Sequence, residues 1–262
     1  MRNYRRHQQH RSLKRVSLVL LFVVLIGFAF FLYRSFISPY SFRLKAIAEN
    51  GNFPPGEVRG LDISHYQQEI DWDKVGAATL GGRRVGFVFI KATEGADKFD
   101  DFFNSNFAQA KRHGIARGAY HFFSTKSSAK RQAEYFCRMV WLEEGDLPPV
   151  LDVEVDVERS YGPQKLRSEV LTWLRMVEKH YGVIPIIYAS YAYKQKYLDG
   201  KEFEKYPFWI AHYYVKELEY EGEWSFWQHT DVGEVDGING YVDVDVFNGS
   251  SSEFEDLLLP DR

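Results

Sequence analysis

Residues 148–155 read PPVLDVEV, and this stretch is the strongest single indication of the fold. It has the apolar character of a buried strand, yet it carries two acids, Asp152 and Glu154. Because side chains alternate between the two faces of a strand, both carboxyl groups are expected on the same face. Two carboxyl groups buried side by side cannot both ionise easily, so the pKa of at least one must rise. A protonated acid beside an ionised one is the pair that cleavage of a glycosidic bond requires.

Segments typical of strands and helices alternate on both sides of this stretch. Strands are expected at 58–64, 85–92, 116–123, 149–155 and 184–189. Helices are expected at 73–79, 102–113, 127–144, 163–181 and 191–198. Three further strands, without good helices between them, are expected at 207–213, 224–229 and 241–247. The pattern predicts an α/β fold: a modified TIM-like barrel of five βα units followed by three strands.

Acidic residues occur in or just after several expected strands. Active sites of parallel barrels lie at the C-terminal ends of the strands. Asp62 lies in the first expected strand and Asp243 in the last one. Because the first and last strands become neighbours when a barrel closes, these two acids are expected to meet.

Composition narrows the classes of function. The chain has 262 residues and a formal net charge of -3, so nothing in the overall charge suggests a nucleic-acid partner. Aromatic residues make up 17% of the chain, which suits both a packed core and stacking on sugar rings. Cys137 is the one cysteine, which excludes an intrachain disulfide, and we expect it to be an inert, buried thiol.

The N-terminus has the pattern of a membrane anchor. Residues 16–33 are apolar except for Ser17 and Gly27, and ~18 such residues just cross ~30 Å of hydrocarbon. Basic residues are concentrated before this run, which predicts a cytoplasmic N-terminus and an exported barrel. A cleaved signal peptide is the alternative, but residues 34–39 contain no convincing cleavage site. We therefore favour an uncleaved, single-pass anchor in the cytoplasmic membrane, with the barrel on its periplasmic or extracellular side.

Seven segments of the expected barrel match a known family. They are GLDISHYQ (60–67), FVFIKATEG (87–95), GAYHF (118–122), LDVE (151–154), WIAHY (209–213), FWQ (226–228) and VDVDVF (242–247). In this order and spacing they resemble the glycoside hydrolase family 25 lysozymes, which are N-acetylmuramidases. The resemblance covers residues 59–249 and implies the modified barrel described above. It also implies hydrolysis of the β-1,4 bond between N-acetylmuramic acid and N-acetylglucosamine in peptidoglycan.

The chain is therefore expected to have five parts. They are a basic cytoplasmic segment (1–15), a transmembrane signal anchor (16–33), a tether (34–56), a family 25-like catalytic barrel (57–249) and an acidic C-terminal tail (250–262). The expected partners are peptidoglycan glycan strands and, through the N-terminal helix, the membrane.

The resemblance implies a role for each acid. Glu154 matches the general acid, whose carboxyl group must keep a proton near neutral pH. Asp152 has two candidate roles: a direct nucleophile, or a group that orients the substrate's own 2-acetamido group for attack on the anomeric carbon. We favour the second, substrate-assisted route, with retention of configuration. Asp62 and Asp243 match the remaining active-site acids and are expected to tune the electrostatics or to bond to the sugar.

Simpler structural roles compete with these. Glu154 would instead belong to a structural ion pair, and Asp62 would instead cap the loop that follows it. Asp245 shares the expected face of Asp243, but it stands where the family commonly has Asn, and we assign it no catalytic role. Lys91 and Glu94 are expected to form an ion pair or to line the edge of the cleft.

Aromatic residues near the ends of the expected strands suit sugar binding, because the C–H faces of pyranose rings pack on aromatic rings. The candidates are Tyr120, Tyr188, Trp209 and Tyr213. Trp209 is about equally suited to a place in the core.

Neither a metal nor a cofactor is predicted. The histidines His65, His121 and His212 are scattered rather than spaced as paired ligands, and they are expected to be structural. Two other functions remain open at this point: a metal-dependent hydrolase that uses the acids as ligands, and a non-catalytic peptidoglycan-binding module on the same scaffold.

Overall fold

The structure is a computed structural model that describes all residues except 1–24, 31, 33–52, 160–161, 219–221 and 262. The chain divides into two compact units, Met1–Ala48 and Glu49–Arg262. In the first unit residues 25–30 and 32 are helical, and their large apolar side chains are exposed. Most of the predicted anchor and tether lies outside the described residues. Within the described chain, no helix is both long enough and apolar enough to cross a membrane.

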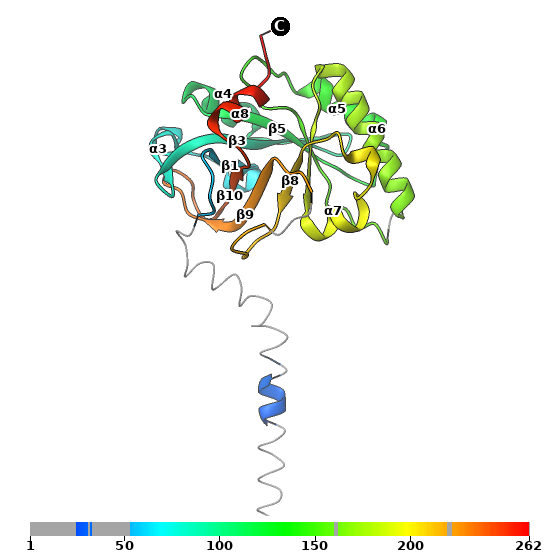
Figure 1. The fold of residues 1–262 in the computed structure, drawn as a ribbon, viewed down its shortest axis with the longest axis horizontal. Coiled ribbons are helices and arrows are strands. Elements are labelled where there is room, and N and C mark those ends of the chain that lie inside the picture. The colour runs from blue at the N-terminus through cyan, green and yellow to red at the C-terminus, as the bar shows by residue number, and fades with distance from the viewer. Residues whose placement is uncertain (1–24, 31, 33–52, 160–161, 219–221, 262) are drawn as a thin grey trace, which may run out of the picture. The chain divides into compact units, whose positions relative to one another are not determined.

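The second unit is built around a closed sheet (Figure 1). Its eight barrel strands are β1 (Arg59–Ile63), β3 (Arg83–Glu94), β5 (Ala116–Phe122), β6 (Val150–Asp152), β7 (Ile186–Ser190), β8 (Phe208–Ala211), β9 (Phe226–Gly233) and β10 (Val242–Phe247). The sheet closes because β1 pairs with both β3 and β10. The first seven of these barrel strands pair in parallel around the barrel, whereas β10 is antiparallel to both of its neighbours. The predicted barrel is confirmed, and the reversed direction of β10 is an addition to it.

Helices follow the first five barrel strands, as predicted. They are α3 (Trp72–Ala77), α4 (Phe103–Arg112), α5 (Ala129–Met139), α6 (Pro163–Tyr181) and α7 (Tyr191–Tyr197). In the described parts of the connections from β8 to β9 and from β9 to β10 there is no helix. The boundaries follow local chemistry: α6 has proline in its first turn and ends at Gly182 in the left-handed conformation, which glycine adopts without strain. Ser128 and Ser190 cap α5 and α7 through their side chains.

Short elements complete the fold, and the sequence pattern had not indicated them. They are the one-turn 3-10 helices η3 (His65–Gln67) and η4 (Lys201–Phe203) and the two-residue strands β2 (Thr79–Leu80) and β4 (Lys98–Phe99).

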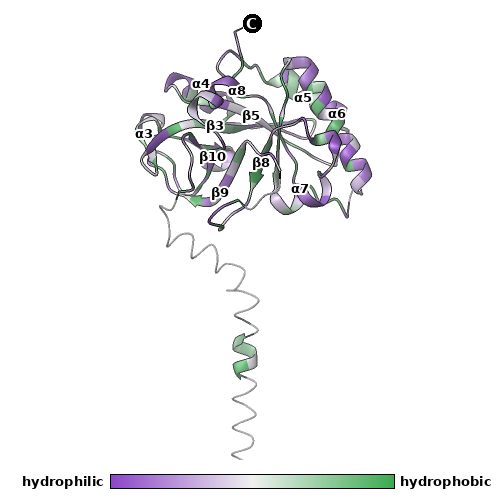
Figure 2. Ribbon diagram, in the orientation of Figure 1, coloured by the Kyte–Doolittle hydropathy of each residue, from purple (hydrophilic) through white to green (hydrophobic). Residues whose placement is uncertain are grey.

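Alternation along the strands produces two cores. In β3, Phe87 and Phe89 point into the barrel, while Val88 and Ile90 pack against the surrounding helices. The barrel interior is aromatic: Phe89 stacks on Trp209, with ring centroids 4.4 Å apart. Figure 2 shows β8 as hydrophobic along its length, whereas α5 and α6 carry both kinds of residue, as amphipathic helices do. Aromatic and aliphatic side chains thus fill the interior of the barrel.

The acidic C-terminal segment, which the sequence predicts as a tail, is partly helical and packed. It forms α8 (Ser251–Leu257), which begins at Ser250 with a capping box. Phe254 joins the barrel core, with its ring centroid 5.6 Å from that of Phe87. Leu259 is also buried, and its backbone N–H donates to the carbonyl of Asp146. Apolar residues among the acids, together with this backbone hydrogen bond, thus hold the segment against the barrel.

Candidate active site

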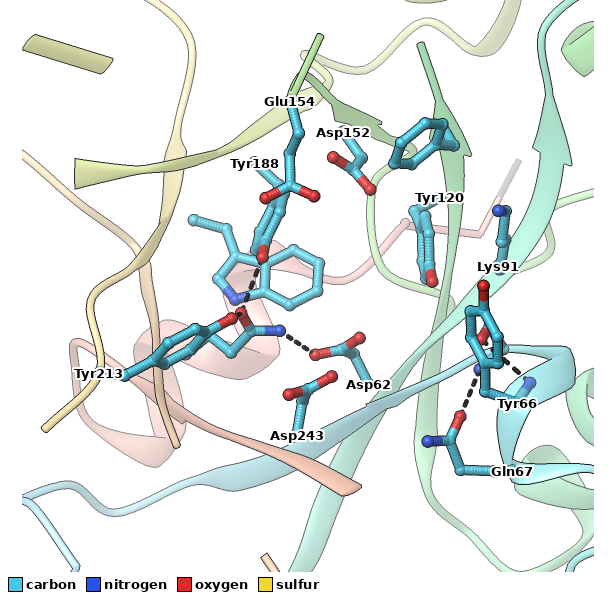
Figure 3. A pocket seen from close by; sticks show the side chains of 14 residues that line it. Asp62, Tyr66, Gln67, Lys91, Tyr120, Asp152, Glu154, Tyr188, Tyr213 and Asp243 are labelled. Carbon is cyan, nitrogen blue, oxygen red and sulfur yellow. Dashed lines mark hydrogen bonds between the residues drawn. The ribbon is translucent and has the colours of Figure 1, made fainter. Parts of the chain in front are cut away.

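A cavity of about 270 Å³ opens among the C-terminal ends of the barrel strands. Figure 3 shows its lining, which comes from segments spread over most of the barrel sequence. All eight side chains predicted from the sequence as site residues line it: Asp62, Tyr120, Asp152, Glu154, Tyr188, Trp209, Tyr213 and Asp243.

Strand pairing brings Asp62 and Asp243 together. They are direct partners in the β1–β10 register, and Figure 3 shows their carboxyl groups close to each other at the base of the site. Asp62 is near the C-terminal end of β1, but Asp243 is near the N-terminal end of β10. Because β10 runs antiparallel, its first residues lie at the edge where the other strands end. The prediction that the two acids lie close together is confirmed, but Asp243 lies on a strand that runs antiparallel to β1.

Asp152 and Glu154 enter the cavity at different depths. Asp152 is the last residue of β6 and is only 7% exposed. Its Oδ1 atom has no hydrogen-bond partner among the described residues. Glu154 lies two residues beyond the strand and is exposed at the cavity mouth. The prediction that both acids lie within one strand was therefore wrong, although both carboxyl groups point into the pocket (Figure 3).

Burial and mutual repulsion favour the protonated forms of these acids. Burial, followed by the charge of Glu154, raises the pKa of Asp152 well above its usual value, and Lys91 acts in the opposite direction. Glu154 as a whole residue is exposed, but its carboxyl group lies among the cavity walls, and this partial loss of hydration raises its pKa. Among the described residues no basic partner offsets the rise. Glu154 therefore forms no structural ion pair with the described residues. Both shifts agree in direction with the expectation from the PPVLDVEV stretch.

The pKa of Asp62 is also raised well above its usual value. Burial is the largest cause, and the charges of Asp243 and Asp245 come next. The Asp62 side chain accepts a hydrogen bond from the Gln228 amide, whereas the turn after β1 is capped by Ser64. Capping is thus not the role of Asp62. Acids from β1, β6 and β10 and from the segment just after β6 share this site, and each one disfavours ionisation of its neighbours.

Gln228 connects the acids to the aromatic residues of the site. Its Nε2 donates to Asp62 Oδ2, and its Oε1 accepts from the hydroxyl groups of Tyr188, at 2.8 Å, and of Tyr213. In this orientation the amide N–H donates to Asp62, so Asp62 Oδ2 is the acceptor of that hydrogen bond.

The predicted aromatic residues divide into wall and floor. Tyr120 and Tyr188 are 9% and 7% exposed and form the wall, together with the half-buried Tyr213. Trp209 is 2% exposed and serves both as core and as cavity floor. Its indole N–H donates to Asp245 Oδ1 at 2.7 Å, which places Asp245 in the interior rather than on the cavity lining.

Comparison with known proteins places this geometry in a family. The family model described as glycosyl hydrolases family 25 matches residues 61–238. The chain belongs to glycosyl hydrolases family 25. The prediction of an enzyme is confirmed at this level: the chain is a glycoside hydrolase of the lysozyme, or muramidase, family.

Individual relatives agree with this assignment. The chain is 45% identical to the uncharacterized protein YegX of Escherichia coli K12 over 76% of this chain and 72% of that protein. It is 33% identical to Lysozyme M1 of Streptomyces globisporus over 74% of this chain and 69% of that protein. A solved family 25 glycosyl hydrolase from Bacillus anthracis superposes with a TM-score of 0.70 and 34% identity, covering 78% of this chain and 94% of that one.

Several charged and histidine side chains near the four acids form hydrogen bonds that hold this family 25 barrel together. Lys91 bonds to Glu94 at 2.9 Å and also lines the cavity, so both expected roles apply to Lys91. His121 is buried between Thr93 and Gln132. In the described part of the chain, no group of three or more His, Cys, Asp or Glu side chains is arranged to hold a metal ion.

Sequence reasoning did not select five of the lining residues: Ser64, Tyr66, Gln67, Phe122 and Gln228. Gln228 carried a usable signal: in FWQ it occupies an inward-facing position of a buried strand, where a polar side chain needs a partner. Tyr66 and Gln67 belong to a 3-10 turn that the strand and helix periods do not predict.

Proposed function

We propose that this family 25 enzyme cleaves the β-1,4 bond between N-acetylmuramic acid and N-acetylglucosamine in peptidoglycan. The observation that carries the proposal is the pairing of Glu154 and Asp152 in one cavity. Glu154 is at the mouth with a raised pKa, and Asp152 is deeper with an unpartnered oxygen. A protonated carboxyl group that substrate can reach, beside a second acid, meets the chemical need of glycoside hydrolysis.

We further propose the substrate-assisted, retaining route. Glu154 gives its proton to the glycosidic oxygen as the bond from that oxygen to the anomeric carbon breaks. The oxygen of the same sugar's acetamido group forms the new bond to the anomeric carbon. Glu154, now a carboxylate, takes a proton from the water that opens the resulting ring. Two displacements at one carbon give overall retention.

Asp152 is placed to accept a hydrogen bond from the acetamido N–H of the substrate, through the Oδ1 atom that has no partner among the described residues. Burial and the charge of Glu154 disfavour the ionised form of Asp152 in the protein by itself. Positive charge on the oxazolinium-like intermediate favours ionisation of a carboxyl group beside it. Lys91, which lowers the pKa of Asp152, acts in the same direction. The proposed intermediate and Asp152 therefore stabilise each other.

The products released from peptidoglycan test the bond that is cut. Full-length protein is expected to release fragments whose reducing end is N-acetylmuramic acid, because the proposed leaving group is the 4-hydroxyl of N-acetylglucosamine. Mass spectrometry of the fragments after borohydride reduction identifies this end. Fragments that carry reduced glucosamine would show a glucosaminidase and overturn the proposed specificity.

We also propose that the barrel is held at the outer face of the cytoplasmic membrane and acts on nearby wall. The support is the basic segment 1–15 followed by the apolar run 16–33. Alkaline phosphatase, which is active only after export, is expected to be active in cells when fused after residue 56. An inactive fusion that accumulates at full length would overturn the proposed orientation.

A further inference from the structure

The cavity is small for an enzyme that acts on a polymer. Its volume of about 270 Å³ lies just below the ~300–1,000 Å³ that is usual for small-ligand pockets. A glycan strand has many more sugars than such a space can hold. Most of a bound strand must therefore lie across the rim, where only surface side chains can contact it.

Tyr66 is the most exposed aromatic side chain on this rim. It lines the cavity and is 78% exposed. Within the described barrel unit, the one large apolar or aromatic side chain with greater exposure is Trp141, at 82%. In Figure 3, Tyr66 lies across the site from Tyr213, on the far side of Asp62 and Tyr120. It therefore extends the aromatic lining away from the acids.

The ring of Tyr66 is supported from behind. It packs against the ring of His65, with centroids 4.3 Å apart and planes 33° apart. The backbone N–H and the Nδ1 atom of His65 both bond to Asp100 Oδ2, at 2.9 and 3.0 Å. Asp100 is itself only 6% exposed. An anchored ring thus covers one part of Tyr66, while most of its surface remains open to a ligand.

The turn that carries Tyr66 is fixed to the catalytic strands. Ser64 caps η3, with the Tyr66 backbone N–H donating to Ser64 Oγ at 3.3 Å and the Ser64 N–H donating to Gln67 Oε1 at 3.0 Å. Gln67 Nε2 donates to the carbonyl oxygen of Tyr241, just before β10. The turn therefore joins the strands that carry Asp62 and Asp243. A platform ordered in advance loses little conformational entropy when it binds a ligand.

We infer that Tyr66 is a stacking platform for a pyranose ring of the glycan strand, in a subsite at the rim of the cavity. The inference rests on the proposed function, because it takes peptidoglycan as the substrate. The C–H face of a sugar ring packs on an aromatic face, and Tyr66 presents such a face at the end of the cavity. Because this contact lies away from the reacting bond, it contributes to binding rather than to the chemical step.

Steady-state kinetics of the Tyr66→Ala full-length protein test the platform. The substrates are long glycan strands from which an amidase has removed the peptides, and a soluble fragment of two disaccharide units. On long strands we expect a three- to tenfold rise in KM with kcat nearly unchanged. This rise corresponds to about 0.7–1.4 kcal/mol, which is the size of one aromatic stacking contact. On the short fragment we expect little change. Tyr66→Phe should keep the wild-type KM, because the ring face is retained.

Trp141→Ala is the matched control. Trp141 is as exposed as Tyr66, but it lies between α5 and β6, on the connection that enters the barrel from the end opposite the cavity. This variant should leave both KM values unchanged. Tyr66 is a surface side chain, and thermal unfolding will show that its removal leaves the fold intact.

The outcomes separate the subsite from the activity. An unchanged KM for Tyr66→Ala on long strands overturns the platform while leaving the muramidase proposal standing. An effect seen only on strands that keep their peptides overturns the sugar assignment in favour of a peptide contact. If wild-type protein hydrolyses neither substrate, the proposed function fails. In that case, co-sedimentation with insoluble glycan still measures the contribution of Tyr66 to binding. If Tyr66→Ala bound glycan as tightly as the wild-type protein does, the stacking platform would be refuted.

Discussion

Replacement of Glu154 by Gln is expected to lower kcat on peptidoglycan by about 10²–10⁴-fold, the usual contribution of a general acid. The amide keeps the size of the side chain and its place at the cavity mouth, but it has no proton to transfer to the glycosidic oxygen. Binding should change little, because Glu154 forms no described ion pair whose loss would disturb the site. Release of soluble fragments measures turnover, and co-sedimentation with purified wall measures binding.

Glu158→Gln is the control for this substitution. Glu158 lies four residues further on and outside the cavity, and its exposed carboxylate bonds to Lys196 and Tyr197. This variant should retain wild-type kcat. Equal turnover by Glu154→Gln and wild type would remove the general-acid role. Wall binding by a wild-type protein that releases nothing would instead support the non-catalytic binding module.

The pH profile gives a second measurement on the same variant. A general acid acts only while it is protonated, and burial raises the pKa of Glu154 above its usual value. Wild-type kcat/KM should therefore be retained to a higher pH than an ordinary glutamic acid allows and should fall as pH rises through the raised pKa. The residual activity of Glu154→Gln should lack this alkaline decline. A decline that persists unchanged would have to come from another group in the acid cluster.

The barrel and its acids were predictable because they depend on local pattern and on closure. The strand and helix periods located five βα units, and closure alone brought Asp62 and Asp243 together. The direction of β10 was not evident, because a strand's own pattern is the same in either direction. The sequence does carry one indication of this direction, which is the short connection between β9 and β10, residues 234–241. A link this short, without a helix, suits antiparallel rather than parallel neighbours.

Other features escaped because they depend on tertiary contacts. Alternation continues through Glu154 in the sequence, but Asp152 is the last residue of β6 that pairs with β5 and β7. The bonding of Gln228 to two tyrosines and Asp62 requires side chains from β1, β7 and the region after β8. The periodicity of a single segment cannot predict contacts between side chains from different segments. The packing of Phe254 into the barrel is of the same kind.

Replacement of Asp152 by Asn is expected to lower kcat by about 10²–10³-fold, the usual effect of removing one preorganised electrostatic group. The amide fits the same buried position but cannot become the anion that stabilises a positively charged intermediate. Glycan hydrolysis measures the loss, and Asp156→Asn is the control. Asp156 is exposed, pairs with Arg159 and does not line the cavity, so its replacement should have little effect.

The substrate separates the two roles of Asp152, which a large loss of kcat alone does not. If the acetamido oxygen attacks the anomeric carbon, wild-type enzyme should fail on glycans from which the muramic acid N-acetyl group has been removed. If Asp152 attacks directly, the same glycans should still be cut, because the attacking carboxylate belongs to the enzyme. NMR of the first product anomer should show retention on acetylated glycan in both cases. An inverted product would exclude both routes and require water to attack directly, with Asp152 as its base.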